Sequence, residues 1–305
     1  MENVPEIIKE EKKKLFKNFN YDKSYKILFF IPFVILLISL IYLGVFYSKN
    51  GDIIYKDVSL SGGTSITLNG EIDQSQIEIS LKEKFPDVSF TRLEDITTGK
   101  QIALMIESSA SPDELKAGVE DVIGYHLNEE DFSIEFTGAS LSNDFYRQLI
   151  LALIISFVLM SIVIFVMFKT FIPSTAVIFA IFADIAIPLA LIDIMGIKIS
   201  AAGIAAFLML VGYSVDTDIL LTSRALKSRE EPLNTRIFKA FKTGSSMTIT
   251  ALAAVLPAFF IVTGLPDSFR QIFLILAIGL FADLINTWLT NAGIIKWYCK
   301  RKGIQ

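Results

Sequence analysis

Six long apolar stretches constrain the fold of this chain more than any other feature. They cover residues 27–47, 149–168, 172–195, 199–222, 245–264 and 269–290. About 20 apolar residues, rising ~1.5 Å each, are enough to cross the hydrocarbon core of a bilayer. Because 52% of the 305 residues are hydrophobic, well above the share of most soluble domains, we predict a membrane protein with an all-α bundle of six transmembrane helices.

The region between the first two spans, residues 48–148, has the pattern of a water-soluble domain. Strand patterns fall at 64–68, 88–93, 101–107 and 132–136, and helical spacing falls at 73–85 and 112–127. Asp73 and Ser111 are suitable N-caps for the two helices. The order βαββαβ predicts a ferredoxin-like α+β domain, in which two helices cover one face of an antiparallel sheet.

Charge is distributed unevenly along the chain. Residues 48–148 contain 19 acidic and 8 basic residues, whereas Lys and Arg are concentrated in the N-terminal arm 1–26, the connection 223–244 and the tail 291–305. Cytoplasmic segments of membrane proteins are enriched in Lys and Arg. We therefore expect a multi-pass protein of the cytoplasmic membrane, with both termini in the cytoplasm and the ferredoxin-like domain on the outer side.

The N-terminal arm carries seven lysines ahead of the first apolar run. That run is too long for the apolar region of a signal peptide, so we predict an uncleaved membrane anchor. The arm itself is compatible with a helix lying on anionic lipid and with a solvated basic segment.

Composition excludes several kinds of chemistry. Cys299 is the one cysteine and His126 the one histidine, so the chain can form no internal disulfide and no zinc site built from Cys and His. We expect no metal, no cofactor and no nucleic-acid partner.

Acidic residues inside the apolar runs are the strongest functional signal. Asp216 and Asp218 lie in the fourth run, Asp184 in the third and Asp283 in the sixth. A charge at this depth costs at least ~2.5 kcal/mol, so such residues face protein or water. Asp216 and Asp218, two positions apart on a helix, point in different directions. We interpret this pair as the proton or ion coupling residues and give Asp184 and Asp283 a structural role.

A simpler interpretation of the same acids stays open. They could hydrogen-bond neighbouring helices, or pair with Arg224 and Lys239 near the cytoplasmic face. The fourth span is also rich in Gly, Ala and Ser, which lets helices approach closely and places this span at the centre of the bundle.

Two motifs and one connection resemble a known family. Leu60 to Thr64 contains Gly62-Gly63-Thr64, which from sequence alone is a turn or bulge before a strand. The stretch from Val211 to Arg224 begins VGYSVDTD, and Asn234 to Thr248 leads into the fifth span. These segments resemble the SecF family of protein-export membrane proteins, in its archaeal form, and the resemblance covers nearly the whole chain.

The resemblance implies a function and several site residues. SecF proteins belong to the resistance-nodulation-division superfamily and work with SecD beside the SecY translocon, using the ion gradient to assist late export of polypeptides across the membrane. Thr217 occupies the position of the family's functional aspartate, flanked by Asp216 and Asp218, and Lys239 occupies that of a family arginine. Tyr213 and Ser214 of the same motif count as supporting residues.

Other classes fit parts of the sequence. Six spans with one outer domain also match half of a secondary transporter for a small solute or lipid, which would need a partner half. Two intramembrane aspartates occur in aspartyl proteases too, but the compact Gly-x-Gly-Asp run of that class is missing around Asp283. We favour a non-enzymatic export subunit that forms a heterodimer with SecD through its fourth span.

Overall fold

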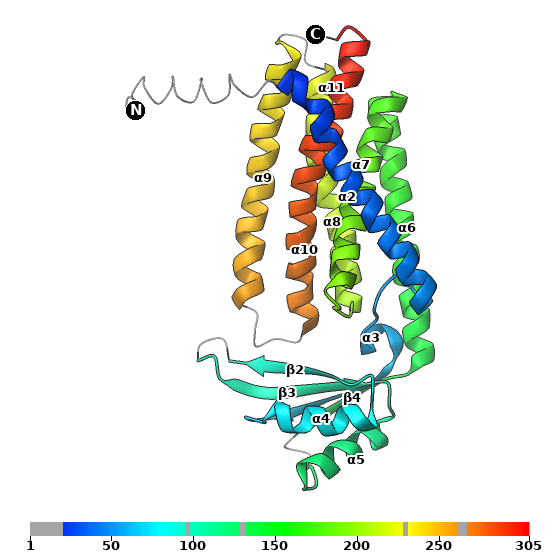
Figure 1. The fold of residues 1–305 in the computed structure, drawn as a ribbon, viewed down its shortest axis with the longest axis vertical. Coiled ribbons are helices and arrows are strands. Elements are labelled where there is room, and N and C mark those ends of the chain that lie inside the picture. The colour runs from blue at the N-terminus through cyan, green and yellow to red at the C-terminus, as the bar shows by residue number, and fades with distance from the viewer. Residues whose placement is uncertain (1–20, 96–97, 129–131, 228–230, 262–266, 305) are drawn as a thin grey trace.

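The molecule has two parts, a long helical bundle and a small sheet domain attached to one end of it (Figure 1). This computed structural model describes residues 21–95, 98–128, 132–227, 231–261 and 267–304. The start of α2 and the end of α11 lie at the end of the bundle that is remote from the sheet.

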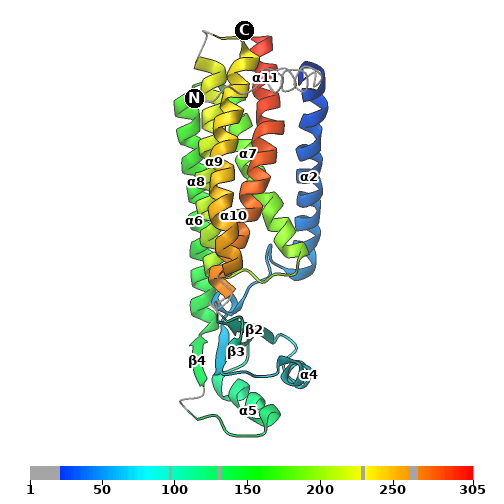
Figure 2. The same ribbon diagram turned by 90° about the vertical axis from the view of Figure 1, so that its left-hand side faces the viewer.

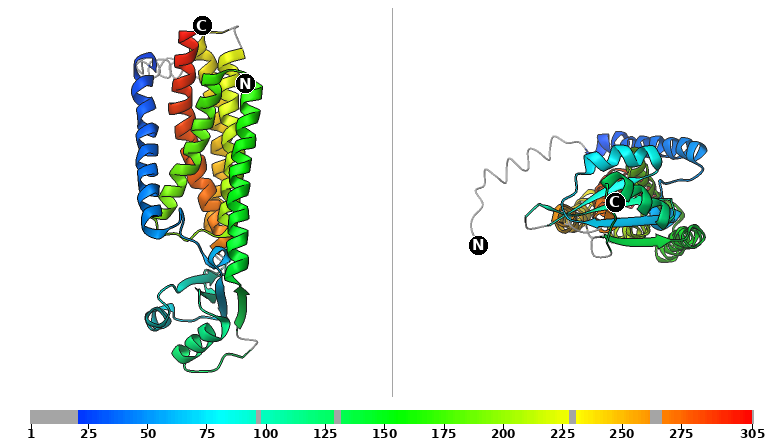
Figure 3. Two further views of the ribbon diagram at one scale, coloured as in Figure 1. Left: turned by 90° about the vertical axis from the view of Figure 1, so that its right-hand side faces the viewer. Right: turned by 90° about the horizontal axis from the view of Figure 1, so that it is seen from below.

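Six helical runs among the described residues are long and apolar enough to cross a membrane, which confirms the predicted number. They are α2 (Tyr21–Asn50), α6 (Ala139–Phe168), α7 (Phe171–Ile194), α8 (Ala201–Lys227), α9 (Leu233–Ile261) and the continuous run α10 (Asp267–Ile285), η1 (Asn286–Asn291) and α11 (Ala292–Arg301). They run side by side, with α2 and α6 on opposite sides of the bundle (Figures 2 and 3).

The helices differ sharply in how much of their apolar surface the chain itself covers. In α7, in α8 and in the sixth run, half or more of the apolar 18-residue stretch is buried inside the chain, against 6% in α6 and 17% in α9. Helix α8 packs against α6, α7, α9 and α10, which confirms its central position. The exposed sides of α6 and α9 are therefore surfaces for lipid or for another chain.

Small residues allow the central helices to approach closely. A Cβ added to Gly279 of α10 would lie 2.3 Å from a methyl carbon of Leu210 in α8, so the glycine accepts the leucine side chain. In the same way, a Cβ added to Gly203 of α8 would lie too close to the side chains of Gln271 and Ile275 in α10. These contacts let side chains of α7, α8 and α10 meet in one core.

The segment 223–244, expected to be a connection, is largely helical. Helix α8 continues to Lys227 and α9 already begins at Leu233. Leu233, Ile237 and Ala240 pack on Trp288 and its neighbours at this end of the bundle. Hydropathy detects only the strongly apolar part of a helix, so it misses the first turns of α9, which are polar on one side and packed on the other.

The sheet domain contains four antiparallel strands and two helices. The strands are β1 (Gly63–Asn69), β2 (Ser89–Glu94), β3 (Gln101–Ser108) and β4 (Phe132–Thr137), in the order β2-β3-β1-β4. Helices α4 (Gln74–Lys84) and α5 (Pro112–Ile123) cover the face of the sheet that is turned away from the bundle (Figure 1). Ile66, Leu104, Leu81 and Leu115 form part of the core between them.

Local sequence signals account for the ends of these two helices. The Asp73 carboxylate accepts a hydrogen bond from the Ser75 N–H at 2.9 Å, and Ser111 forms a capping box with Glu114. Helix α5 ends at Ile123, four residues earlier than predicted, because Gly124 adopts a left-handed conformation with φ of 78°.

Asp87 ties the edge of the sheet domain together. Its carboxylate accepts hydrogen bonds from the Ser109 N–H at 2.6 Å and the Ser108 hydroxyl at 3.1 Å, and its carbonyl accepts one from the Lys198 ammonium at 3.1 Å. Partial burial opposes ionisation, but the hydrogen bonds from Ser109 and Ser108 to the carboxylate outweigh it and hold the pKa of Asp87 below its ordinary 3.8.

This lowered pKa predicts a pH-dependent contribution to stability. Since the folded pKa lies below the unfolded one, ionised Asp87 stabilises the fold above the unfolded value, and the contribution is lost as the pH falls through the folded pKa. We expect Asp87→Asn to lower the unfolding temperature at neutral pH, with the difference from wild type shrinking below about pH 4. Thermal unfolding in detergent measures this. The exposed Glu83→Gln serves as control, and an equal pH-dependent loss in that variant would contradict the assignment.

Candidate functional site

Three carboxylates from three different helices meet in the core of the bundle. Asp184 comes from α7, Asp218 from α8 and Asp283 from α10, and each is at most 1% exposed. No ion pair joins any of them to a basic side chain in the part of the chain that the structure describes. Hydroxyl and amide groups surround them instead.

Asp184 has a donor on each side of its carboxyl group. The Ser214 hydroxyl of α8 donates a short hydrogen bond to Oδ2, and the Asn286 amide of η1 donates to Oδ1 at 2.6 Å. This carboxyl therefore joins α7 to both α8 and the sixth span.

Asp218 is held through a single oxygen. Its Oδ1 accepts hydrogen bonds from the Thr287 hydroxyl at 2.9 Å and from the Asn291 amide at 2.7 Å. Its Oδ2 is equally buried but has no hydrogen-bond partner among the described residues. One oxygen of this carboxyl is thus held by two donors, while the other has none among the described residues.

Asp283 is surrounded by hydroxyl groups, three from threonines and one from Ser214. The Thr217 hydroxyl lies 3.0 Å from Oδ1 and 3.3 Å from Oδ2, the Thr287 hydroxyl 3.0 Å from Oδ1, and the Thr248 hydroxyl 3.5 Å from Oδ2. These threonines come from α8, η1 and α9, so the cluster unites four of the six spans.

A π-helical turn positions the donors of the sixth span. Within η1 the N–H of Ala292 bonds to the carbonyl of Thr287, five residues earlier, in place of the usual four. The wider turn brings Asn286, Thr287 and Asn291 to the side that carries Asp283. Such turns are rare and occur often at functional sites.

The structure separates the two acids of the VGYSVDTD motif. Asp218 enters the cluster, while Asp216 is exposed on the opposite side of α8 together with Tyr213, as the spacing predicts. Ser214 and Thr217 of the same motif are buried and donate to Asp184 and Asp283. The motif therefore has one buried polar face and one exposed polar face.

Arg224 and Lys239 do not reach these carboxylates. The Arg224 guanidinium donates to the carbonyl of Lys239 at 2.8 Å and to the Thr243 hydroxyl at 3.1 Å, and the Lys239 ammonium pairs with Glu231 at 2.5 Å. In the part of the chain that the structure describes, the buried intramembrane acids hydrogen-bond neighbouring helices, as one form of the simpler interpretation expected, and do not pair with Arg224 or Lys239. Arg224 instead fastens the C-terminal end of α8 to α9.

The Gly62-Gly63-Thr64 motif joins the sheet domain to the membrane bundle. A Cβ on Gly62 would lie 2.4 Å from the Cα of Ala139, the first residue of α6, and one on Gly63 would lie 2.3 Å from the carbonyl oxygen of Ser108. Both glycines have positive φ, 82° and 141°. Thr64 donates to the Ala110 carbonyl at 2.7 Å. The glycines are needed because backbones come too close for a side chain.

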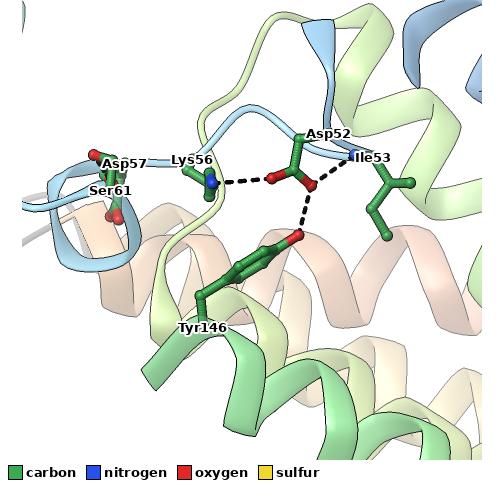
Figure 4. A network of polar contacts seen from close by, with 6 residues as sticks. All are labelled: Asp52, Ile53, Lys56, Asp57, Ser61 and Tyr146. Atoms are coloured by element: carbon green, nitrogen blue, oxygen red, sulfur yellow. Dashed lines mark hydrogen bonds and ion pairs between the residues drawn. The ribbon is translucent and has the colours of Figure 1, made fainter. Parts of the chain in front are cut away.

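Polar contacts at Asp52 and Asp57 hold the linker that precedes this motif. Asp52 accepts from the Tyr146 hydroxyl of α6 at 2.6 Å and pairs with Lys56 at 2.9 Å (Figure 4). Burial would raise the pKa of Asp52, but these contacts outweigh it and lower the pKa. Asp57 accepts from Ser59 and so caps the short helix α3 (Val58–Ser61).

The same linker is hydrogen-bonded to the beginning of α8. Ile199 N–H donates to the Tyr55 carbonyl at 2.6 Å, Asp57 N–H donates to the Ile199 carbonyl at 3.1 Å, and Ala201 N–H donates to the Ser59 hydroxyl at 3.0 Å. The helix that carries Asp218 is therefore tied directly to the base of the sheet domain.

Sequence analysis missed four members of the cluster, namely Thr248, Asn286, Thr287 and Asn291. A signal was present, because Asn286, Thr287 and Asn291 follow Asp283 by three, four and eight positions and so share its helix face. Thr248 gave no such signal, since its partner acid lies 35 residues away.

Comparisons with known proteins agree with this architecture. The fold and the buried acids define a multi-pass membrane protein of the SecD/SecF class, and the family described as "Protein export membrane protein SecD/SecF, C-terminal" matches residues 119–301. A protein-export membrane protein SecF from Methanolacinia petrolearia is 36% identical over 90% of this chain and 93% of its own length. SecF from Methanocaldococcus jannaschii is 33% identical, with 90% and 96% covered. The chain belongs to the SecF family.

Solved structures share the fold across nearly the whole chain. SecDF from Thermus thermophilus, described as a translocon-associated membrane protein, superposes with a TM-score of 0.69 at 18% identity and covers 93% of this chain. SecDF in a super-membrane-facing form gives a TM-score of 0.59 at 20% identity with the same coverage. In both cases the chain spans 39% of the length of the SecDF chain.

The junction motif makes a specific prediction about stability. Gly63→Ala adds backbone strain and a clash with the Ser108 carbonyl, so we expect a loss of about 3 kcal/mol or more. Gly70 also has positive φ, at 109°, but open space around it, so Gly70→Ala should cost only the strain, about 1–2 kcal/mol. Thermal unfolding in detergent measures both. Equal losses would show that the close approach at Gly63 is unimportant.

Proposed function

We propose that this chain is an accessory subunit of the Sec export machinery that works with SecD and is driven by the proton gradient. Membership of the SecF family supports the export role. The observation that carries the coupling mechanism is the cluster of three carboxylates in the bundle core, which contains no basic partner among the described residues.

The cluster is suited to bind and release protons. Desolvating each additional carboxylate costs several kcal/mol, and the three would also repel each other. At least part of the cluster therefore gains a proton when the surrounding helices close on it, and loses it when water enters. Asp218 is the main proton carrier in this proposal, because one of its two oxygens, Oδ2, has no hydrogen-bond donor among the described residues, which leaves its ionised form incompletely solvated. Asp216, exposed on the other face, takes no part in proton binding.

The charge distribution supports an orientation of the chain in the membrane. The acidic region 48–148 lies at one end of the bundle, and the basic segments around Arg224 to Lys242 and Lys296 to Lys302 lie at the other (Figure 1). By the positive-inside rule, the sheet domain faces the outside and both termini face the cytoplasm. The exposed apolar sides of α2 and α6 then contact lipid.

The outer domain is of the ferredoxin-like kind in this proposal. The order of elements β1-α4-β2-β3-α5-β4 and the sheet order β2-β3-β1-β4 support this, together with the two helices on one face. Its place at the end of α8 suits a role in handling polypeptide that emerges from SecY.

The exposed polar face of α8 is the contact surface for SecD. Met209, Gly212, Tyr213 and Asp216 recur every three or four residues and remain exposed although α8 is otherwise central. A carboxylate facing lipid is costly, so a partner chain that covers Asp216 would relieve this cost. The greater length of the SecDF chains, of which this chain matches 39%, supports a second membrane half.

Crosslinking tests this contact surface. In a Cys299→Ser background, we expect Tyr213→Cys to crosslink with SecD in membranes, because Tyr213 is 50% exposed on the α8 face. Leu159→Cys, 57% exposed on α6, is a matched control and should be labelled by a lipid-phase reagent instead. The reverse pattern would place SecD on α6 and contradict the proposal.

Export assays test the assignment of the proton carrier. We expect Asp218→Asn to slow export of a secretory protein by about tenfold or more, in line with loss of a group that transfers protons. Asp216→Asn should retain export, apart from weaker association with SecD. Pulse-chase labelling with parallel measurement of protein abundance checks both. Normal export by Asp218→Asn at normal abundance would show that the cluster only holds helices together.

A further inference from the structure

The Thr287 hydroxyl lies between two carboxyl groups of the cluster. Its Oγ1 lies 2.9 Å from Oδ1 of Asp218 and 3.0 Å from Oδ1 of Asp283, so it contacts two carboxyl groups from two helices. The side chain is fully buried. Its place in the π-helical turn η1 directs it between α8 and α10.

The number of protons limits how these contacts can form. A threonine hydroxyl has one proton to donate and lone pairs to accept. If both carboxyl groups were ionised, only one contact could be a hydrogen bond, and the other would bring together two oxygens without a proton. Both contacts are satisfied when one carboxyl is protonated and donates to Thr287 while Thr287 donates to the other. The geometry thus suits one proton shared by Asp218 and Asp283.

We propose that the Thr287 hydroxyl relays this proton between Asp218 and Asp283. In one direction, the Asp218 carboxyl, protonated on Oδ1, gives this proton to Oγ1 of Thr287, while the proton of Oγ1 passes to Oδ1 of the Asp283 carboxylate. Thr287 ends the step unchanged, Asp218 becomes ionised and Asp283 becomes protonated. The relay rests on the proposed proton coupling and adds a residue and a direct route to it, with no water required between the two acids.

The surroundings favour movement of the proton in both directions. Asn291 donates to Oδ1 of Asp218, which stabilises its ionised form. The Thr217 hydroxyl lies 3.0 Å from Oδ1 of Asp283 and 2.9 Å from the carbonyl of Ser214, so it can donate to either. Each carboxylate therefore has a hydrogen-bond donor within reach besides Thr287, while Oδ2 of Asp218 has none among the described residues. A change in the π-helical turn would alter the distances from Thr287 and so interrupt the route.

Removal and restoration of the hydroxyl test the relay. Thr287→Val keeps the shape and removes the hydroxyl, whereas Thr287→Ser keeps the hydroxyl and removes the methyl group. The readout is proton flux into proteoliposomes that contain the full chain with SecD, under an imposed pH gradient. We expect Thr287→Val to lower the flux by about tenfold or more and Thr287→Ser to stay within about twofold of wild type, as for a group that transfers protons.

A matched control comes from the same turn. Thr290 is also buried, and its hydroxyl has no hydrogen-bond partner among the described residues, so Thr290→Val should keep the flux. If Thr287→Val fails to accumulate, Thr287→Ala replaces it as the variant without a hydroxyl, and its flux should fall below that of Thr287→Ser. Thermal unfolding of each variant confirms that the fold is intact.

The outcomes separate the relay from the proposed function. Wild-type flux in Thr287→Val, or equal losses in Thr287→Val and Thr287→Ser, would overturn the relay. In that case a loss of flux in Asp218→Asn would leave proton coupling in place. Wild-type flux in Asp218→Asn as well would overturn the proposed coupling itself.

Discussion

The burial of three carboxylates in an apolar bundle is the constraint on which the rest of the membrane part depends. A carboxylate in this environment is tolerated only with hydrogen-bond donors around it. Six side chains from α8, α9 and the sixth span supply these donors, namely Ser214, Thr217, Thr248, Asn286, Thr287 and Asn291. The requirement accounts for the small residues that let α8 and α10 approach, and for the irregular turn that aims the donors of the sixth span.

The polar cluster and the sheet domain are connected through α8. Its C-terminal half carries Asp218, and its beginning is hydrogen-bonded to Tyr55, Asp57 and Ser59 of the linker next to the sheet domain. Gly62 and Gly63 then join that linker to β1 and α6, and the backbones there are too close to admit a side chain. In our proposal, a shift of α8 caused by a change of charge in the cluster would thus reach the base of the sheet domain through these hydrogen bonds.

The buried and exposed faces of the helices have different roles in the bundle. The inner faces of α7, α8 and α10 make the polar cluster, while α6 and α9 leave most of their apolar surface uncovered. Helix α8 is unusual because it contributes to both, with Asp218 inside and Asp216 outside. A single motif therefore provides the proton carrier in our proposal and the surface on which a second membrane half would pack.

The sequence by itself determined the number of membrane helices, the order of strands and helices in the sheet domain, and the opposite orientations of Asp216 and Asp218. These features follow from composition and periodicity within one segment. Only the tertiary structure decided which acid is buried, that Asp184 and Asp283 join it, and that Thr287 lies between two of them. The partners are 66 to 102 residues apart, and local periodicity reports which face a residue occupies but not which helix packs against that face.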